Sequence, residues 1–547
     1  MPYTPAMNDP DSLTRFPYAS QRSAVVASEA MVATSQPLAA QAGLGVLADG
    51  GSAVDAAIAT AAALTVVEPC SNGLGGDAFA IVWDGERLHG LNGSGRWPLS
   101  SSAEQLRKAG ADQVSLYGWA PVTVPGAVDS WDQLHQRFGK LPIDRLLAPA
   151  IKYAEKGFPI SPVVSMMWQR AYSKYSQLGI AELSDWFDVF SGSSDPGRAP
   201  RAGEMWATPG HARGLRSMAE HGLRDFYEGE IAAAIADHAS ATGGMISADD
   251  LADHHGEWVD PISVSYRDHD VWEIPPNGQG IAALMALGIA GETAAGELPH
   301  LSEEGWHLNI EAMKLAFSDS DAFVADPEHA DVPVEQLLSP KYLASRAALI
   351  DDRAGSPATG DPQSGGTVYL ATADKDAMMV SFIQSNYHGF GSGVVVPSHG
   401  IALQNRGAGF TLEPGHPNVA APGKRPRHTI IPGFLTRNGQ PVGPFGVMGG
   451  EMQPQGHLQV VAAMIDHGCN PQAALDAPRW QVGRDHTVRV EQEVPTEIVE
   501  GLKRRGHTVR VESDRTSFGR GQIIQRSPEG VYIAGSEPRA DGAAIGF

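Results

Sequence analysis

The order of apolar and polar positions predicts two helices first and a sheet after them. Segment 35–51 has a proline near its start and a Gly-Gly pair at its end, which predicts a short helix. Ser52, with Asp55 three residues later, predicts the N-terminus of a second helix over AVDAAIATAAALTVV, whose alanines indicate close packing and burial. The runs AFAIVW and RLHGLN flank Asp84-Gly85 and predict a β-hairpin. The first sheet is therefore expected to begin here.

Helical spacing dominates the next part of the chain, up to about residue 350. Ser247 is the expected N-cap of a helix in SADDLADHH. The segment EEGWHLNIEAMKLAFSDSDAF (303–323) repeats apolar residues at helical intervals. This half of the chain is therefore expected to be rich in helices.

The composition changes at 351–366, where DDRAGSPATGDPQSGG contains four glycines, two prolines and two serines. This composition favours exposed backbone and makes the segment the best candidate for a linker. Two β-rich runs, TVYLATAD and MMVSFIQS, follow it, so Thr367 is expected at the first position of a strand. Strand patterns such as GQIIQR then alternate with helical patterns such as GHLQVVAAMIDHG, and the chain is predicted to be an α/β protein.

Composition limits the class of function. The chain has 547 residues, 42% of them apolar, which is enough for a substantial core. Its formal charge of −23 argues against nucleic acid and anionic membranes as partners, because binding to them depends on clustered Lys and Arg. The N-terminal stretch lacks the basic start and apolar run of a secretory signal, and no run of about 18 apolar residues occurs. We therefore expect a soluble, cytoplasmic enzyme.

Disulfide and metal chemistry find little support in the sequence. Cys70 and Cys469 are the only cysteines, which excludes a disulfide framework and a Cys-rich metal site. A single bridge between them stays open, although two free core thiols is the interpretation we favour. His254 and His255 stand among aspartates, but consecutive helical residues point about 100° apart, and an acidic first turn accounts for the aspartates. We assign no metal.

A loop that ends in Gly-Gly and precedes a strand-initiating Thr has the arrangement that self-cleavage requires. The hydroxyl of Thr367 would attack the carbonyl carbon of Gly366, which a glycine leaves unobstructed. Hydrolysis of the resulting ester would free the α-amine of Thr367, and its ordinary pKa of about 7.7–8.0 suits a general base. The same residues also fit an ordinary loop that enters a strand, so the local pattern leaves both interpretations open.

A set of motifs stands in one order along the chain: VPGAV (124–128), GGTVYLATAD (365–374), GFGSGVVVP (389–397), PGKRP (422–426), MGG (448–450) and APRW (477–480). With these motifs the chain resembles the γ-glutamyltransferase family. The resemblance implies an N-terminal-nucleophile hydrolase with a four-layer αββα fold, made as a proenzyme. Cleavage would give a large subunit, residues 1–366, and a small subunit, residues 367–547, intertwined in one domain.

The resemblance also implies roles for single residues. Thr367 matches the family's nucleophile, and Gly449 and Gly450 match the glycine pair whose N–H groups form the oxyanion hole. Arg96 lies where the family has an arginine that holds the α-carboxylate of the glutamyl group, and a surface arginine is the alternative. Ser385 falls where the family often has a second threonine that hydrogen-bonds the nucleophile. An ordinary strand hydroxyl is the alternative for Ser385.

Other positions depart from the family. Where well-studied members hold the substrate's α-amino group with an Asn and an Asp, this chain has Tyr387 and Gly409. The paired serines that help to hold the α-carboxylate are replaced by His428 and Thr429. Tyr387 is suited to stack on a bulkier acyl group or hydrogen-bond it, and His428 is expected either to bind a carboxylate or to be a satisfied core histidine. With no room for a lid before PGKRP, the chain resembles the lidless branch that includes cephalosporin-acylase-like proteins.

These features predict acyl transfer in two steps. Thr367 would take the acyl group of a γ-glutamyl amide or a related N-acyl amide, and water or an amine acceptor would resolve the ester. The reaction needs no cofactor, because a nucleophile, a base and an oxyanion site suffice. The missing amine-binding carboxylate favours N-acyl substrates or weak glutathione activity. A glutaryl or cephalosporin-type acylase and an unprocessed, non-catalytic binding protein stand as alternatives.

Overall fold

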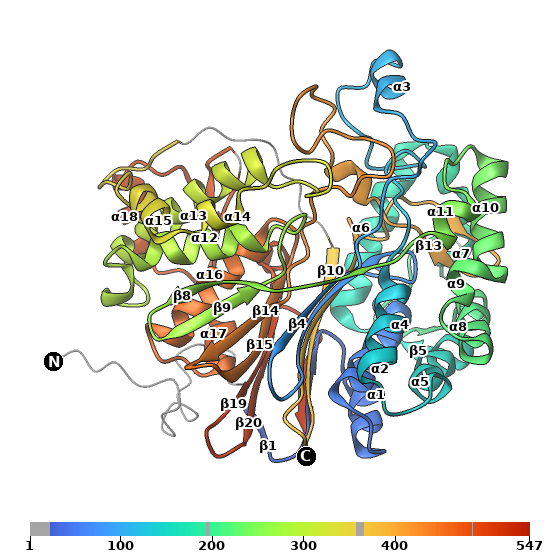
Figure 1. Cartoon of the computed structure of the whole chain (residues 1–547), viewed down its shortest axis with the longest axis horizontal. Helices are drawn as coiled ribbons and strands as arrows, with labels where there is room; N and C mark the ends of the chain where they lie inside the picture. Colours follow the sequence, from blue (N-terminus) through green and yellow to red (C-terminus); the bar gives the residue numbers. More distant parts are fainter. Residues whose placement is uncertain (1–21, 193–196, 357–365, 484) are drawn as a thin grey trace.

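Two antiparallel sheets stacked face to face form the centre of the molecule (Figure 1). The computed structural model describes residues 22–192, 197–356, 366–483 and 485–547. One sheet, called here the β15 sheet, has the strand order β1 (Val25–Ala27), β20 (Tyr532–Ser536), β19 (Arg520–Arg526), β15 (Gln440–Met448), β14 (Gly433–Arg437), β9 (His269–Glu273) and β8 (Ile262–Tyr266). The other, the β10 sheet, has the order β21 (Ala543–Gly546), β2 (Met31–Thr34), β10 (Gly366–Ala373), β11 (Met379–Tyr387), β3 (Asp77–Trp83), β4 (Leu88–Asn92) and β7 (Glu257–Val259).

Alternation along the strands produces three separate apolar layers, because successive side chains in a strand point to opposite faces. In β3, Ala78 and Ala80 face a core shared with helices, whereas Phe79 and Ile81 contribute to the core between the two sheets. A third core lies between the outer face of the β15 sheet and a second group of helices. The layers are therefore α, β, β, α, and the predicted sandwich of mixed α/β class is confirmed.

The helices on the outer face of the β10 sheet come from the first half of the chain. They are α1 (Pro37–Ala48), α2 (Ala53–Val67), α4 (Ala127–Phe138), α5 (Ile143–Lys156), α6 (Pro162–Leu178), α7 (Ser184–Phe190), α8 (Pro209–His221), α9 (Asp225–Glu228), α10 (Glu230–Thr242) and α11 (Ala248–Ala252). Every residue of α2 is buried, as its alanines predicted, and Ser52 and Asp55 form the predicted reciprocal cap. Ser247 caps α11 in the same way.

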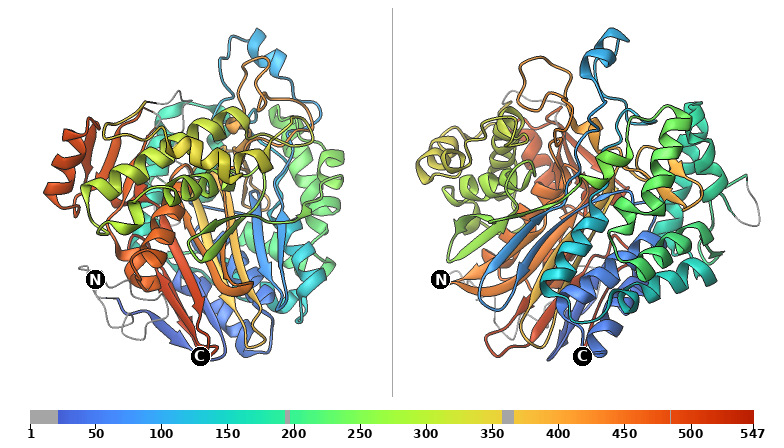
Figure 2. Two further views of the ribbon diagram at one scale, coloured as in Figure 1. Left: turned by 60° about the vertical axis from the view of Figure 1, so that its left-hand side comes forward. Right: turned by 45° about the vertical axis from the view of Figure 1, so that its right-hand side comes forward.

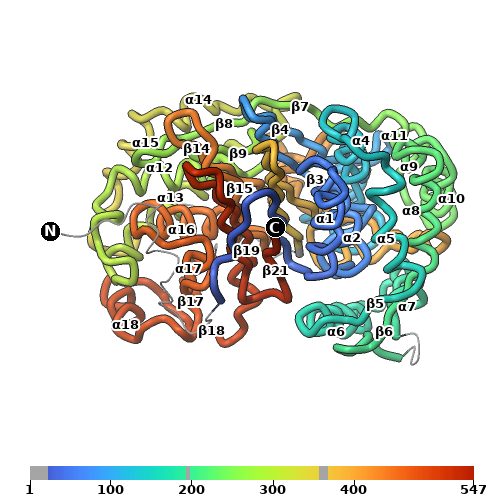
Figure 3. The backbone as a smooth tube through the Cα atoms, turned by 90° about the horizontal axis from the view of Figure 1, so that it is seen from below, coloured from blue at the N-terminus to red at the C-terminus, as the bar shows by residue number. Residues whose placement is uncertain are grey.

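The helices on the outer face of the β15 sheet are α12 (Gly280–Gly291), α13 (Glu303–Phe323), α14 (Val334–Leu337), α15 (Pro340–Ala347), α16 (Met452–Ile465), α17 (Pro471–Asp476) and α18 (Thr496–Arg504). A small sheet of β16 (Trp480–Val482), β17 (Val488–Glu491) and β18 (Val509–Glu512) lies beside them. The views in Figure 2 and the end-on view in Figure 3 show the two helical groups on opposite sides of the strands. The predicted helix over 303–323 is confirmed.

Strands β7, β8 and β9, at 257–273, interrupt the half of the chain that was predicted to be helical. β7 is the edge strand of the β10 sheet, and β8 is the edge strand of the β15 sheet with β9 next to it. Their sequences alternate over only three to five residues, which is too short a stretch to stand out among helical patterns. The predicted hairpin of β3 and β4 is confirmed, and Thr367 is the second residue of its strand, because β10 begins at Gly366.

In the described part of the chain, one further α-helix and two strand pairs belong to neither of the two large sheets. They are α3 (Ala103–Lys108) and the strand pairs β5 (Phe158–Pro159) with β6 (Met205–Trp206) and β12 (Val395–Val396) with β13 (Ile401–Ala402). Neither Cys70 nor Cys469 is part of a disulfide. Among the described residues, no helix has the length and apolar character needed to cross a bilayer. Most of the predicted linker, 357–365, lies outside the described residues.

Candidate active site

Thr367 lies at an irregularity where β10 starts and β11 ends. Gly366 pairs with Tyr387 and Val368 pairs with Gln384, so two residues of β11 face the single residue Thr367. Such bulges re-aim side chains and are frequent beside active sites. The Oγ1 atom of Thr367 lies 3.1 Å from Oγ of Ser385, and both residues are buried. The predicted pair of hydroxyls is therefore in direct contact.

A buried arginine, which we did not identify from the sequence, lies directly behind this pair. Nη2 of Arg406 donates to Oγ of Ser385 over 3.3 Å, and Nη1 donates to Oγ1 of Thr429 over 2.8 Å. The guanidinium also lies 4.2 Å from the centre of the Tyr387 ring. Tyr387 adopts a left-handed backbone (φ +77°), and its N–H donates to Oγ of Ser385 over 2.8 Å. Three of the predicted site residues thus surround one unpredicted cation.

Gln279 connects this cluster to the glycine turn after β15. Its Nε2 donates to the carbonyl oxygen of Thr429 over 2.7 Å and to that of Gly450 over 3.0 Å. A hydrogen-bonded path therefore runs from Thr367 through Ser385, Arg406 and Thr429 to the turn. The predicted nucleophile and the predicted oxyanion site belong to one connected cluster.

Gly449 and Gly450 form the turn that leads from β15 into α16. Both have positive φ (+140° and +62°), and their carbonyl oxygens accept from the first N–H groups of α16. Among the described residues, neither glycine N–H has a hydrogen-bond acceptor. Fixed N–H donors of this kind can stabilise negative charge on a substrate oxygen without reorganisation. The backbone geometry is thus suited to an oxyanion hole.

A cleft of about 390 Å³ opens beside Gly449. Its walls are lined by aromatic, cationic and small residues: Cys70, Tyr117, Met167, Arg170, Ala171, Lys174, Tyr175, His388, Gly389, Asp514, Thr516, Ser517 and Arg520. Two of the cations are paired, Arg170 with Asp514 at 2.9 Å and Arg520 with Glu68 at 3.2 Å. The cleft provides a route by which a small molecule can reach the glycine turn.

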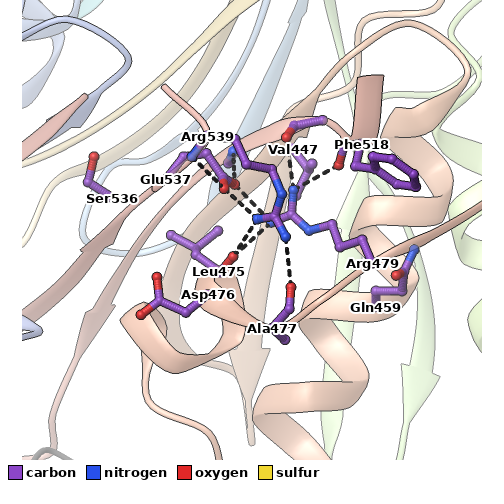
Figure 4. Close-up of polar contacts among 12 residues, drawn as sticks. Val447, Gln459, Leu475, Asp476, Ala477, Arg479, Phe518, Ser536, Glu537 and Arg539 are labelled. Carbon is purple, nitrogen blue, oxygen red and sulfur yellow. Dashed lines mark hydrogen bonds and ion pairs between the residues drawn. The ribbon is translucent and has the colours of Figure 1, made fainter. Parts of the chain in front are cut away.

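A buried ion cluster of Arg479, Glu537 and Arg539 holds the backbone next to the turn, and its contacts are drawn in Figure 4. Nη1 of Arg479, in the APRW motif, donates to the carbonyl oxygens of Phe518 and Gly519, each over 3.0 Å. Its Nη2 pairs with Glu537 at 2.9 Å, and Arg539 pairs with the same carboxylate at 2.6 Å. A Cβ added to Gly449 would lie 3.2 Å from Cα of Gly519. Arg479 therefore fixes the backbone against which the turn packs.

His428 has the environment of a satisfied core histidine. Its Nε2 lies 3.0 Å from Oδ2 of Asp77, and its Nδ1 accepts from the N–H of Ile430 over 3.3 Å. Burial lowers the pKa of His428 to about 4, so the ring is neutral at pH 7. Asp77 itself is held by three further donors on the main chain and on Gln404. Both ring nitrogens of His428 are thus engaged within the protein.

Arg96 belongs to a different group of charges. Its guanidinium lies 2.7 Å from Glu328, 3.3 Å from Glu257 and 3.7 Å from Asp326. It also donates to the carbonyl oxygen of Gly423. None of these contacts involves Thr367 or the glycine turn, so the structure does not bring Arg96 together with the other predicted site residues.

The comparison with protein families decides the classification. A sequence model described as gamma-glutamyltranspeptidase matches residues 39–547. The chain belongs to the gamma-glutamyltranspeptidase family. This confirms the resemblance inferred from the motifs.

Relatives and solved structures in this family match almost the whole chain. The glutathione hydrolase-like YwrD proenzyme of Bacillus subtilis is 38% identical, over 96% of this chain and 99% of its own. The oxamate amidohydrolase proenzyme of Klebsiella pneumoniae is 35% identical, over 95% of this chain and 99% of its own. The crystal structure of cephalosporin acylase from Bacillus halodurans superposes with a TM-score of 0.92 and 52% identity, over 97% of this chain and 98% of its own.

Two residues of the candidate site, Arg406 and Gln279, lie outside the motifs that this chain shares with the gamma-glutamyltranspeptidase family. Arg406 stands in the run QNRGAGF, three residues before Gly409, and Gln279 stands in a loop before α12. A single arginine or glutamine in a loop carries no periodic or spacing signal. Only the fold brings these two residues to Thr429.

Proposed function

We propose that this protein is a self-processing amide hydrolase and acyltransferase whose nucleophile is Thr367. The observation that supports this most directly is the contact of Thr367 with Ser385 at the end of the linker, in one hydrogen-bonded cluster with the Gly449–Gly450 turn. Cleavage between Gly366 and Thr367 would give the large subunit 1–366 and the small subunit 367–547. It would also free the α-amine that serves as general base.

The reaction follows from these groups. The α-amine of Thr367 takes the hydroxyl proton while Oγ1 forms a bond to the carbonyl carbon of the amide. The N–H groups of Gly449 and Gly450 hold the negative oxygen, the C–N bond breaks, and the leaving nitrogen takes the proton. Water or an amine then attacks the ester and restores the Thr367 hydroxyl. Ser385, which receives hydrogen bonds from Tyr387 and Arg406, orients the nucleophilic oxygen.

The substrate class is a γ-glutamyl amide or a related N-acyl amide. Relatives named for glutathione, oxamate and cephalosporin substrates all match nearly the full chain, which supports an amide bond as the common target. Gly409 carries no side chain to pair with an α-ammonium group, which favours the second candidate, an acylase for glutaryl-type amides. Arg96 could hold a substrate carboxylate only if its three acidic partners moved away from the guanidinium.

Intact mass under denaturing conditions tests the proposal. Wild-type protein is expected to give two fragments that meet at Gly366 and Thr367, and Thr367→Ala a single chain. The cleaved enzyme should then release nitroaniline from γ-glutamyl or glutaryl p-nitroanilide. An uncleaved wild-type chain without activity on either anilide would reject the proposal and favour a non-catalytic binding protein.

A further inference from the structure

Arg406 is a buried cation without a carboxylate partner. It is 0% exposed, and among the described residues no carboxylate oxygen lies within 4 Å of its guanidinium. Its two hydrogen-bond partners, Ser385 and Thr429, are neutral hydroxyls, and its Nε has no acceptor. The other buried arginines among the described residues each pair with a glutamate: Arg425, Arg479, Arg520 and Arg539.

An isolated buried charge is expensive, so this arrangement needs an explanation. Burial lowers the pKa of Arg406 to about 10, which still leaves the guanidinium charged at pH 7. Asp77 and Glu451 are acids whose charges act on Arg406 through space, and both have closer partners. Asp77 faces His428 and Gln404, and Glu451 lies 3.6 Å from Arg427. Among the described residues, neither acid forms an ion pair with Arg406, so the guanidinium has no carboxylate in direct contact.

The position of Arg406 indicates what that partner is. Two hydrogen bonds in series, through Ser385, place Nη2 no more than about 6.5 Å from the Oγ1 atom of Thr367. This distance is short enough for the acyl group of an ester on Thr367 to reach the guanidinium. The free Nε–H and the weakly bonded Nη2 lie on one edge, which can form two parallel hydrogen bonds with a carboxylate.

We infer that Arg406 binds a carboxylate on the acyl part of the substrate, and that the preferred substrates are monoamides of dicarboxylic acids. The inference rests on the proposed function and names its substrate class. Tyr387 and Gly409, which replace the family's amine-holding residues, flank Arg406 on either side in the sequence, and Tyr387 covers its guanidinium. A cation at this place repels an α-ammonium group. γ-Glutamyl amides are therefore poorer substrates than their counterparts without the amine.

The test compares three p-nitroanilides that differ only in the acyl group: glutaryl, its neutral methyl ester, and γ-glutamyl. For the wild type we expect kcat/KM to be at least about 50-fold higher for glutaryl than for the ester, which corresponds to one charged pair. Arg406→Met should reduce this ratio to about one, even if the variant also lowers kcat/KM equally for all three substrates. Arg406→Lys should retain part of the ratio. Arg96→Met is the matched variant and should keep the ratio.

Binding gives a second readout that does not depend on turnover. Calorimetry with glutarate and neutral glutaramide should show binding of the acid alone to the wild type and to Arg96→Met, and loss of binding in Arg406→Met. Loss of the ratio or of glutarate binding in Arg96→Met, with Arg406→Met unaffected, would overturn the inference. Glutarate binding that depends on Arg406 in a protein that cleaves no anilide would uphold the inference and reject the proposed function.

Discussion

Replacing Ser385 by alanine tests whether the cluster around the nucleophile works as one unit. Oγ of Ser385 accepts from the N–H of Tyr387 over 2.8 Å and from Nη2 of Arg406 over 3.3 Å, and it lies 3.1 Å from Oγ1 of Thr367. All four residues are buried, so water cannot replace the lost hydroxyl. The variant therefore leaves two donors unsatisfied and frees the nucleophilic oxygen to rotate.

The size of the effect follows from these contacts. An unsatisfied buried donor costs about 1–3 kcal/mol, and one of the two donors is charged, so we expect a loss of about 2–4 kcal/mol in the free energy of unfolding. Loss of the hydrogen bond to the nucleophile adds about 1.5–3 kcal/mol to the barrier, which slows cleavage and turnover roughly 10- to 100-fold. Ser385→Thr keeps the hydroxyl and serves as the control, with cleavage close to that of the wild type.

Two assays separate stability from chemistry. Urea unfolding is measured in the uncleaved Thr367→Ala background, with and without Ser385→Ala, so that both chains are intact. The cleavage rate is followed by intact mass in the Thr367 background. A Ser385→Ala chain that cleaves as fast as the wild type would refute the assignment of Ser385 as the residue that orients Thr367, even if it unfolds at lower urea.

Three further predictions concern the surroundings of the site. Gly449→Ala places a side chain on a backbone with φ +140° and within 3.2 Å of Cα of Gly519, so kcat should fall at least about 100-fold. Gly439→Ala is the control: its φ is +72° and the added methyl group meets no atom, so the variant should lose stability but keep kcat. Arg479→Met removes one of the two cations on buried Glu537 and should cost about 3 kcal/mol in urea unfolding, against less than about 0.5 kcal/mol for Arg489→Met in an exposed pair. His428 has a folded pKa of about 4, below its ordinary value of about 6.5, so its share of the stability is complete above pH 6.5 and is lost as the pH falls toward 4. Unfolding of His428→Gln across this window should show a slope that is shallower by up to about 1.4 kcal/mol per pH unit, and an unchanged slope would mean that His428 keeps its ordinary pKa in the folded protein.

The local patterns at Thr367 and at Gly449–Gly450 left two interpretations open, and the motifs shared with the family singled these residues out as candidates. Thr367 follows a Gly-rich segment and starts a β-rich run, and Gly449 and Gly450 stand together before a helix. The reciprocal cap of Ser52 and Asp55 and the alanines of α2 likewise depend on neighbours within a few residues. Local chemistry of this kind is visible in one sequence without knowledge of the fold.

The recognition part could not be predicted, because it depends on contacts between distant segments. Arg406 meets Thr429 across 23 positions and Gln279 meets Gly450 across 171, and neither pair has a spacing that a sequence pattern would mark. Arg96 shows the converse case. Its residue type suits a carboxylate, but the fold surrounds it with the protein's own Glu257, Asp326 and Glu328. The residue type alone does not reveal whether the charge is already paired with acidic residues of the same protein.

The division between these two parts explains how one fold can serve different amides. In the proposed mechanism, Thr367, Ser385 and the glycine turn act on the carbonyl group, which every amide substrate has, so they cannot discriminate among acyl groups. Discrimination has to come from side chains that reach the rest of the acyl group, and we infer that Arg406, beside Ser385 and Tyr387, is a charged one among them. A carboxylate there gains a buried ionic pair, whereas an ammonium group would lose its water and meet a second cation. The inferred role of Arg406 therefore predicts that exchanging its charge changes the preferred acyl group while the proposed bond-breaking groups stay as they are.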